Sequence, residues 1–159
     1  MRDPSGSARA LVLGIGNPLM SDDGVGLRIL EVLAGLAPAL DGVRYLDAGT
    51  LGFLLLPDIE DSDSLLLLDA ARLGAAPGEL RVFEGSAMDE FLAGNSAGVH
   101  DVSLRDMLDA ARLTGGLPER RALVAVQPGK VDWGLSLSAA VESAVIPAAM
   151  RAREILERW

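Results

Sequence analysis

Residues 64–69, Ser-Leu-Leu-Leu-Leu-Asp, decide the fold class, because four consecutive leucines stand directly before an acid. The run has the length of a strand, and apolar residues at every position are typical of a strand that is covered on both faces. Strands of that kind occur in parallel sheets whose connections are helices. The segments on either side are therefore expected to alternate between strands and helices.

The rest of the chain follows this alternation, with short apolar runs between longer segments whose apolar residues recur at helical spacing. Val25, Ile29 and Leu33, for example, share one face of a predicted helix. The pattern predicts an α/β fold: a mostly parallel five-stranded sheet with helices on both faces. Besides 64–69, strands are predicted at 10–14, 43–47, 80–84 and 122–126, and helices at 24–37, 50–56, 103–113 and 138–158.

Local signals set the expected ends of three helices. Pro57 is expected to stop the helix at 50–56, and Ser103 with Asp106 resembles a capping pair at the start of the helix at 103–113. Pro147 is expected to bend the last helix, because an interior proline removes a backbone hydrogen bond.

The composition restricts the chemistry that the chain can perform. It has 159 residues, enough for the single domain that we expect at 10–159 after a polar tail at 1–9. The 14 Lys and Arg against 23 Asp and Glu give a net charge of −9, and an acidic chain without a basic cluster is a poor partner for nucleic acid. The absence of cysteine excludes disulfides, thiolate metal sites and cysteine catalysis. The one histidine, His100, would have to serve any site that needs an imidazole.

No segment has the features of a membrane span or an export signal. The first nine residues are polar, and the apolar run after them is interrupted by Gly14, Gly16 and Asn17. The longest apolar runs, such as 65–68, are far shorter than a bilayer requires. We therefore expect a cytoplasmic protein without membrane contacts, and we expect it to be a monomer.

Acids from two distant parts of the chain are expected to meet at one edge of the sheet. In open α/β sheets, sites form at the carboxyl ends of the strands, where the direction of winding reverses. Asp22 and Asp23 follow the first strand, and Asp69 ends the strand of leucines. If the third strand lies beside the first, on the side opposite the second, these carboxylates converge on one crevice.

Each candidate residue also has a simpler structural explanation. Ser21 to Gly24 is a typical helix start, where a serine caps the helix and acids interact favourably with its dipole. Asp69 would be a turn residue that accepts hydrogen bonds from loop amides, and His100 a surface residue. Against this, a carboxylate directly after four leucines is partly buried and needs partners.

The loop at 14–19, Gly-Ile-Gly-Asn-Pro-Leu, resembles part of a dinucleotide-binding fingerprint. Leu19, however, stands where that fingerprint needs a third glycine for close packing of helix on strand. No acid follows at the distance from which a ribose is bound, and no Gly-Lys-Ser/Thr is present for a phosphate loop. A nucleotide-binding module is therefore disfavoured, and no nucleotide cofactor is expected.

Four stretches carry a resemblance to a known family: Leu11-Val12-Leu13-Gly14-Ile15-Gly16-Asn17-Pro18-Leu19-Met20-Ser21-Asp22-Asp23-Gly24-Val25-Gly26, Leu46-Asp47-Ala48-Gly49-Thr50, Leu66-Leu67-Leu68-Asp69-Ala70-Ala71 and Gly98-Val99-His100-Asp101. In this order they resemble the hydrogenase maturation endopeptidases, which process nickel–iron hydrogenases. A fifth, weaker stretch runs from Val126 to Ser138. The resemblance spans nearly the whole chain from about residue 10, and its first stretch is the most specific.

The resemblance implies a three-layer fold of the phosphorylase/hydrolase type and three metal-contacting positions, which fall on Asp23, Asp69 and His100. Glutamate is common in the family at the first position, and Asp23 is one methylene shorter, so Asp22 is an alternative ligand. The metal implied is the nickel already installed in the hydrogenase large-subunit precursor. The reaction implied is removal of a C-terminal extension from that nickel-loaded precursor.

The residue types agree with such a site. Two carboxylates and one imidazole form an oxygen–nitrogen site for a divalent ion, and imidazole suits nickel or zinc. Three protein ligands leave coordination positions open for substrate. Peptide hydrolysis would then use a metal-polarised carbonyl or a metal-activated water, with Asp23 or Asp69 as the catalytic general base.

Five residues near the carboxylates are expected to shape a groove for an extended peptide, since glycine allows two backbones to approach closely. They are Gly14, Gly16, Asn17, Gly49 and Thr50. The alternative function from another class is a non-proteolytic metal-binding chaperone or checkpoint protein that uses the same ligands. Loss of mass from the precursor would distinguish the protease from this alternative.

Overall fold

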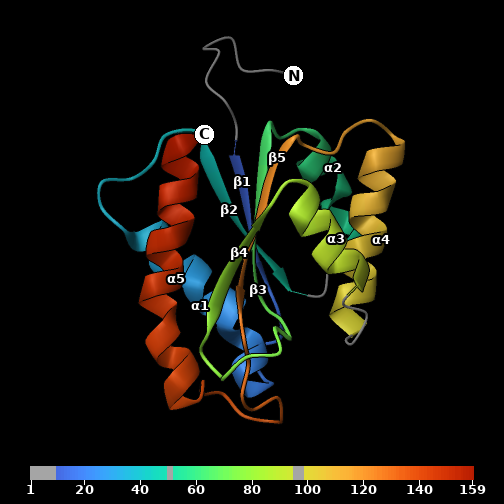
Figure 1. Cartoon of the computed structure of the whole chain (residues 1–159). Coiled ribbons are helices and arrows are strands. Elements are labelled where there is room, and N and C mark those ends of the chain that lie inside the picture. The colour runs from blue at the N-terminus through green and yellow to red at the C-terminus, as the bar shows by residue number, and fades with distance from the viewer. Residues whose placement is uncertain (1–9, 50–51, 95–98) are drawn as a thin grey trace.

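The computed structural model describes residues 10–49, 52–94 and 99–159, and within these ranges it leaves the side chains of 52–53 and 99–103 undescribed. In this part of the chain, strands form one sheet in the order β2-β1-β3-β5-β4 (Figure 1). The strands are β1 (Ala10–Ile15), β2 (Val43–Gly49), β3 (Ser64–Ala70), β4 (Leu80–Glu84) and β5 (Arg120–Val126).

The sheet is parallel except at one edge. β1 pairs in parallel with β2 on one side and with β3 on the other, and β3 pairs in parallel with β5. Only β4, paired with β5, runs antiparallel among these strands. The predicted mostly parallel five-stranded sheet is confirmed, and the third strand lies beside the first, on the side opposite the second, as the expected meeting of the carboxylates requires. The carboxyl ends of β1 and β3 therefore lie side by side, where the direction of winding reverses.

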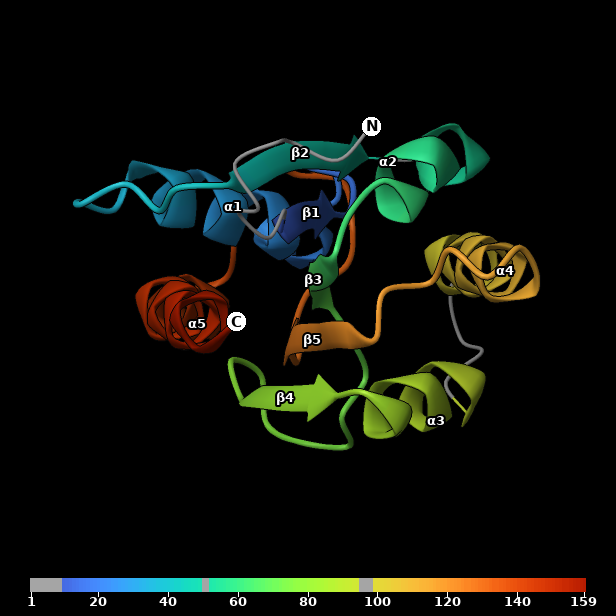
Figure 2. The same cartoon turned by 90° about the horizontal axis from the view of Figure 1, so that it is seen from above.

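Helices cover both faces, which confirms the three-layer architecture. Viewed from above, α1 and α5 lie on one side of the sheet, and α2, α3 and α4 lie on the other (Figure 2). No helix in the described ranges combines the length and apolar character that crossing a bilayer requires. The helices are α1 (Val25–Gly35), α2 (Leu56–Glu60), α3 (Ser86–Gly94), α4 (Val99–Leu113) and α5 (Ala139–Arg158), with 3-10 turns η1 (Ser21–Gly24) and η2 (Gly52–Leu55).

The leucine strand contributes to a separate apolar core on each face. Leu66 and Leu68 pack in the core beneath α1 and α5, whereas Leu65 and Leu67 pack in the core beneath α2, α3 and α4. All four side chains are fully buried. Burial of a leucine contributes about 1.5–3 kcal/mol, so this one strand stabilises both layers of the fold. The expectation of a strand covered on both faces is confirmed.

The structure corrects the predicted ends of two helices and adds a third helix. The segment predicted as one helix ending at Pro57 is η2 followed by α2, and Pro57 lies in the first turn of α2. Proline is favoured there because the first-turn amides have no partner within the helix. Helix α4 begins at Val99, so Ser103 and Asp106 lie inside it and do not form a capping pair. Helix α3 was not predicted.

Candidate active site

A glycine brings the turn that carries Asp23 against the carboxyl edge of the sheet. A Cβ added to Gly26, in the first turn of α1, would lie 2.2 Å from the carbonyl oxygen of Leu68 and 2.3 Å from that of Ile15. These carbonyls stand near the ends of β3 and β1. Helix α1 therefore begins directly on the strand ends, and the preceding turn η1 contacts β3.

The loop between β1 and η1 fixes the position of Asp23. Gly16 has a φ of +129°, and a Cβ there would lie 1.9 Å from the carbonyl oxygen of Asp23. The backbone N–H of Asn17 donates to Oδ2 of Asp23 at 2.9 Å, and the N–H of Leu19 donates to Oδ1 of Asn17 at 2.9 Å. The first glycine–asparagine stretch of the sequence thus holds both the backbone and the half-buried carboxylate of Asp23.

Packing within the chain explains the glycines at 14 and 16. Both are buried, and a Cβ on Gly14 would lie 2.9 Å from the Cβ of Leu30 in α1. Asn17 and Gly49 are half-buried, so they have surface that a peptide can contact. The predicted groove stays a prediction, and Thr50 lies outside the described residues.

Asp69 lies at the same edge of the sheet as Asp23. It is the penultimate residue of β3 and is only 5% exposed. Because side chains alternate along a strand, Asp69 shares a face with Leu65 and Leu67, the face that α2, α3 and α4 cover. Asp69 therefore lies at the carboxyl edge of the sheet, on the face that α4 covers.

His100 belongs to the first turn of α4 rather than to the loop before it. Helix α4 leads to the start of β5, at the amino edge of the sheet, so α4 itself begins at the carboxyl edge (Figure 1). The backbone positions of Asp23, Asp69 and His100 are therefore at one edge. The side chain of His100 lies outside the described part of the chain, and the described side chains alone contain no group of three metal ligands. The shared metal site stays a prediction.

Asp22, the neighbour of Asp23, has a function that the sequence did not reveal. Its fully buried carboxylate accepts hydrogen bonds from the backbone N–H groups of Gly129, Lys130 and Ser138, at 2.8, 2.7 and 2.7 Å, and from Oγ of Ser138 at 2.8 Å. Four donors occupy its two oxygens, which disfavours Asp22 as the alternative metal ligand. Asp22 instead anchors the β5–α5 loop, residues 127–138, to the turn that carries Asp23.

Ser21 reinforces this connection and does not cap the helix. Its backbone N–H donates to the carbonyl of Gly134 at 2.9 Å, and its Oγ donates to the carbonyl of Asp132 at 2.9 Å. Its φ is +49°, a conformation that costs energy for any residue with a side chain. The contact between the two loops holds Ser21 in this conformation. Neither η1 nor α1 has a side-chain cap, so the alternative explanation of Ser21 as a helix cap is wrong.

The environment of Asp22 keeps its carboxylate ionised. Burial by itself raises the pKa of Asp22, but the hydrogen bonds from Lys130, Ser138 and Gly129 together outweigh it, and the pKa is lowered from its usual value of 3.8. A carboxyl group whose pKa is lowered on folding contributes stability above its unfolded pKa. That contribution is lost as the pH falls through the lower, folded pKa.

Replacing Asp22 with asparagine is expected to lower the free energy of unfolding by about 3 kcal/mol, because an amide NH2 would face donors in a site without water access. Urea unfolding at pH 7 measures this loss. The difference between wild type and variant should shrink as the pH falls through the lowered pKa of Asp22 in the folded protein, because the wild-type carboxylate is protonated only below that pKa.

Asp132→Asn is the matched control for this prediction, because Asp132 is exposed in the same loop and its carboxylate accepts a local bond from the N–H of Trp133. The substitution leaves unchanged its backbone carbonyl, which accepts from Ser21. Its effect on the free energy of unfolding should stay within about 0.5 kcal/mol. Equal stability of the Asp22→Asn and Asp132→Asn proteins at pH 7 would show that Asp22 is no anchor.

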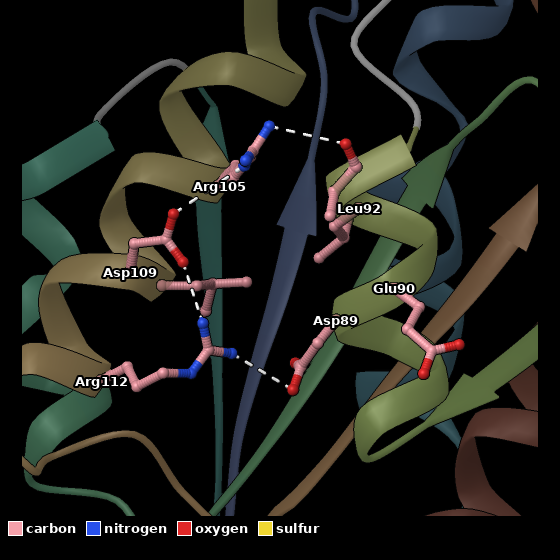
Figure 3. Close-up of a pocket in the computed structure, with 8 residues that line it drawn as sticks. Asp89, Glu90, Leu92, Arg105, Asp109 and Arg112 are labelled. Carbon is pink, nitrogen blue, oxygen red and sulfur yellow. Dashed lines mark hydrogen bonds and ion pairs between the residues drawn. The ribbon is translucent and has the colours of Figure 1, made fainter.

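A separate pocket of about 370 Å³ lies between α3 and α4, and ion pairs join several of the charged side chains that line it (Figure 3). Arg112 lies 3.2 Å from Asp89 and 2.9 Å from Asp109, and Arg121 binds both oxygens of Asp89 at 2.9 and 2.6 Å. The hydrogen bonds from Arg121 are the main cause of the lowered pKa of Asp89. These ion pairs connect the two helices with each other and with β5.

Comparison with known proteins identifies the family. The family model described as hydrogenase maturation protease matches residues 28–155. The hydrogenase expression/formation protein HupD of Rhizobium leguminosarum bv. viciae is 37% identical over 98% of this chain and 78% of its own length. The hydrogenase 2 maturation protease of Escherichia coli is 36% identical over 88% of this chain and 85% of its own length.

Solved structures agree with this assignment. The hydrogenase maturating endopeptidase HybD from E. coli superimposes with a TM-score of 0.89 and 34% identity, covering 94% of this chain and 93% of its own. The [NiFe] hydrogenase maturation protease HybD from Thermococcus kodakarensis superimposes with a TM-score of 0.78 and 28% identity, covering 92% and 98%. The family, the fold and the protease class predicted from the sequence are confirmed. This chain belongs to the hydrogenase maturation protease family.

Proposed function

We propose that this chain is the endopeptidase that removes the C-terminal extension of a nickel–iron hydrogenase large-subunit precursor, and that it acts when the precursor carries nickel. Asp23, Asp69 and His100 are the proposed contacts to that nickel, which belongs to the substrate. The proposed reaction uses no nucleotide, because the glycine loop at 14–19 lacks the remaining features of a nucleotide site.

The observation that carries this proposal is the position of two carboxylates at one edge of the sheet in a chain that belongs to this protease family. Asp23 is held by the loop after β1, and Asp69 ends the buried leucine strand beside it. The start of α4 lies at the same edge and brings the only histidine of the chain there. Carboxylate oxygens and an imidazole nitrogen can contact a divalent ion. Because the chain has no thiolate that would bind the ion tightly, such a contact leaves the metal in the substrate.

The proposed chemistry adds one water molecule across the scissile peptide bond. A metal ion beside the bond polarises the carbonyl or the attacking water. Asp23 or Asp69 accepts the proton that the water loses, and the same carboxyl group can return it to the leaving amine. These two residues are therefore the proposed catalytic groups, while His100 orients the substrate through its metal.

The test is incubation of the purified nickel-loaded precursor with this protein, without ATP, followed by mass spectrometry of the large subunit. The proposed function predicts one new mass, lower by the mass of the C-terminal extension. A precursor made without the extension is the control and should keep its mass. Stable binding of the full precursor with no change in mass would instead support the metal-binding checkpoint protein.

A further inference from the structure

Exposed apolar side chains are concentrated in two loops at the carboxyl edge of the sheet. Trp133 and Leu135 are 74% and 83% exposed, and Leu19 and Val131 are about half exposed. These four make up half of the large hydrophobic side chains that are exposed in the described residues. We call Leu19, Val131, Trp133 and Leu135 the apolar rim. Exposed apolar groups concentrated in this way are typical of surfaces that bind another molecule.

The apolar rim is continuous with the turn that carries Asp23. The N–H of Gly134, between Trp133 and Leu135, donates to the carbonyl of Leu19 at 2.9 Å, and the carbonyl of Gly134 accepts from the N–H of Ser21 at 2.9 Å. The carbonyl of Lys130 accepts from the N–H of Asp22 at 3.0 Å. Backbone hydrogen bonds thus join the β5–α5 loop to residues 19–22, which directly precede Asp23.

The surface at the rim has hollows on two sides. Leu135 lines a pocket of about 580 Å³ that also includes Pro18 and Arg28 of the β1–α1 region. Val131 lines a second pocket, of about 430 Å³, together with Arg72, which follows Asp69 by three residues. Exposed apolar side chains beside open pockets offer a protein partner a broad contact surface, with an apolar centre as protein interfaces have.

We propose that the apolar rim is the surface on which the hydrogenase precursor docks, with Trp133 as its main anchor. This inference rests on the proposed function, because the precursor is the partner whose chain must reach Asp23 and Asp69. Docking at the rim brings an apolar surface of the precursor beside the turn that carries Asp23. A second copy of this chain bound at the rim would cover the entrance to the same edge, so the precursor is the occupant that function requires.

Trp133 is suited to this role because a large, rigid aromatic side chain contributes strongly to an interface when a partner buries it. It contacts the partner away from the scissile bond, so it stabilises the bound substrate and the transition state equally. Loss of such uniform binding raises KM and leaves kcat unchanged. This signature separates docking from a disturbance of the catalytic groups, which would lower kcat.

The test compares Trp133→Ala with Leu113→Ala, a control that removes an 89% exposed side chain at the far end of α4. Cleavage is measured over a range of nickel-loaded precursor concentrations, and precursor binding to the immobilised proteins is measured alongside. We expect Trp133→Ala to raise KM and Kd at least about tenfold with kcat within about twofold of wild type. Trp133→Phe should restore most of the affinity, and Leu113→Ala should match wild type.

Three outcomes would contradict the docking proposal. Unchanged KM and Kd in Trp133→Ala would show that the rim does not bind the precursor, and a lower kcat alone would show that Trp133 acts through the site geometry. A wild-type dimer that Trp133→Ala converts to a monomer, with unchanged precursor affinity, would assign the rim to self-association. If wild type binds the precursor but does not cleave it, the proposed function fails, and the binding comparison still decides the docking proposal.

Discussion

Replacing His100 with alanine is expected to reduce cleavage of the nickel-loaded precursor at least about a hundredfold while the protein stays folded. His100 is the only imidazole in the chain, so no other residue can supply a nitrogen ligand of that kind to the nickel. Alanine is the most favourable residue for a helix, and the first turn of α4 should therefore tolerate it. The measurement is the single-turnover processing rate, with circular dichroism to confirm folding.

Asp106→Ala is the matched control for this prediction, because it removes an exposed polar side chain from the same helix. Its processing rate should equal that of wild type. Cleavage at the wild-type rate by a folded His100→Ala protein would refute the proposed recognition of nickel, although the family assignment would stand.

Asp23→Asn and Asp69→Asn are each expected to lower the processing rate at least about a hundredfold, because the amide has nearly the same shape but cannot accept the proton or carry the negative charge. Asn at position 23 can still accept the hydrogen bond from the N–H of Asn17, so the loop should keep its conformation. Rates are measured on nickel-loaded precursor at saturating concentration.

The neighbouring carboxylates Asp22 and Asp23 provide an internal comparison for this prediction. Asp22→Asn should lose stability, because its carboxylate is the anchor of the β5–α5 loop. Asp23→Asn should lose catalysis and keep most of its stability. The side chain is half-buried, and the amide oxygen of asparagine can replace the carboxylate oxygen that accepts from the N–H of Asn17. A reversal of these two effects would mean that the roles of the two residues are the other way round.

Much of the fold is predictable from the sequence because it depends on the leucine strand. Four consecutive leucines require burial on both faces, and that requirement implies helices on both sides and parallel neighbours. The ends of the helices were less predictable. The fixed φ of Pro57 is compatible both with the end of one helix and with the first turn of the next. Pro57 begins α2 because Ile59, two residues later, packs in the core as part of that helix.

The site was predictable only in its outline, because adjacent residues of the same type differ in their distant partners. Asp22 and Asp23 are indistinguishable by local pattern, yet the donors to Asp22 lie 107 to 116 residues away in the sequence. The glycine loop shows the same limit. The loop lacks the third glycine with which the dinucleotide fingerprint packs helix on strand, and Gly26, beyond that motif, provides the close contact of helix and strand ends.

The most direct test of the central claim uses one preparation of large-subunit precursor, divided into a nickel-loaded and a nickel-free portion. Each portion is incubated with this protein, and the mass of the large subunit is recorded over time. The proposed mechanism predicts loss of the C-terminal extension from the nickel-loaded form alone. Adding nickel to the nickel-free precursor should then start cleavage, because the proposed site at Asp23, Asp69 and His100 acts through the metal of the substrate. Equal cleavage of both forms would contradict the claim that this protease recognises nickel.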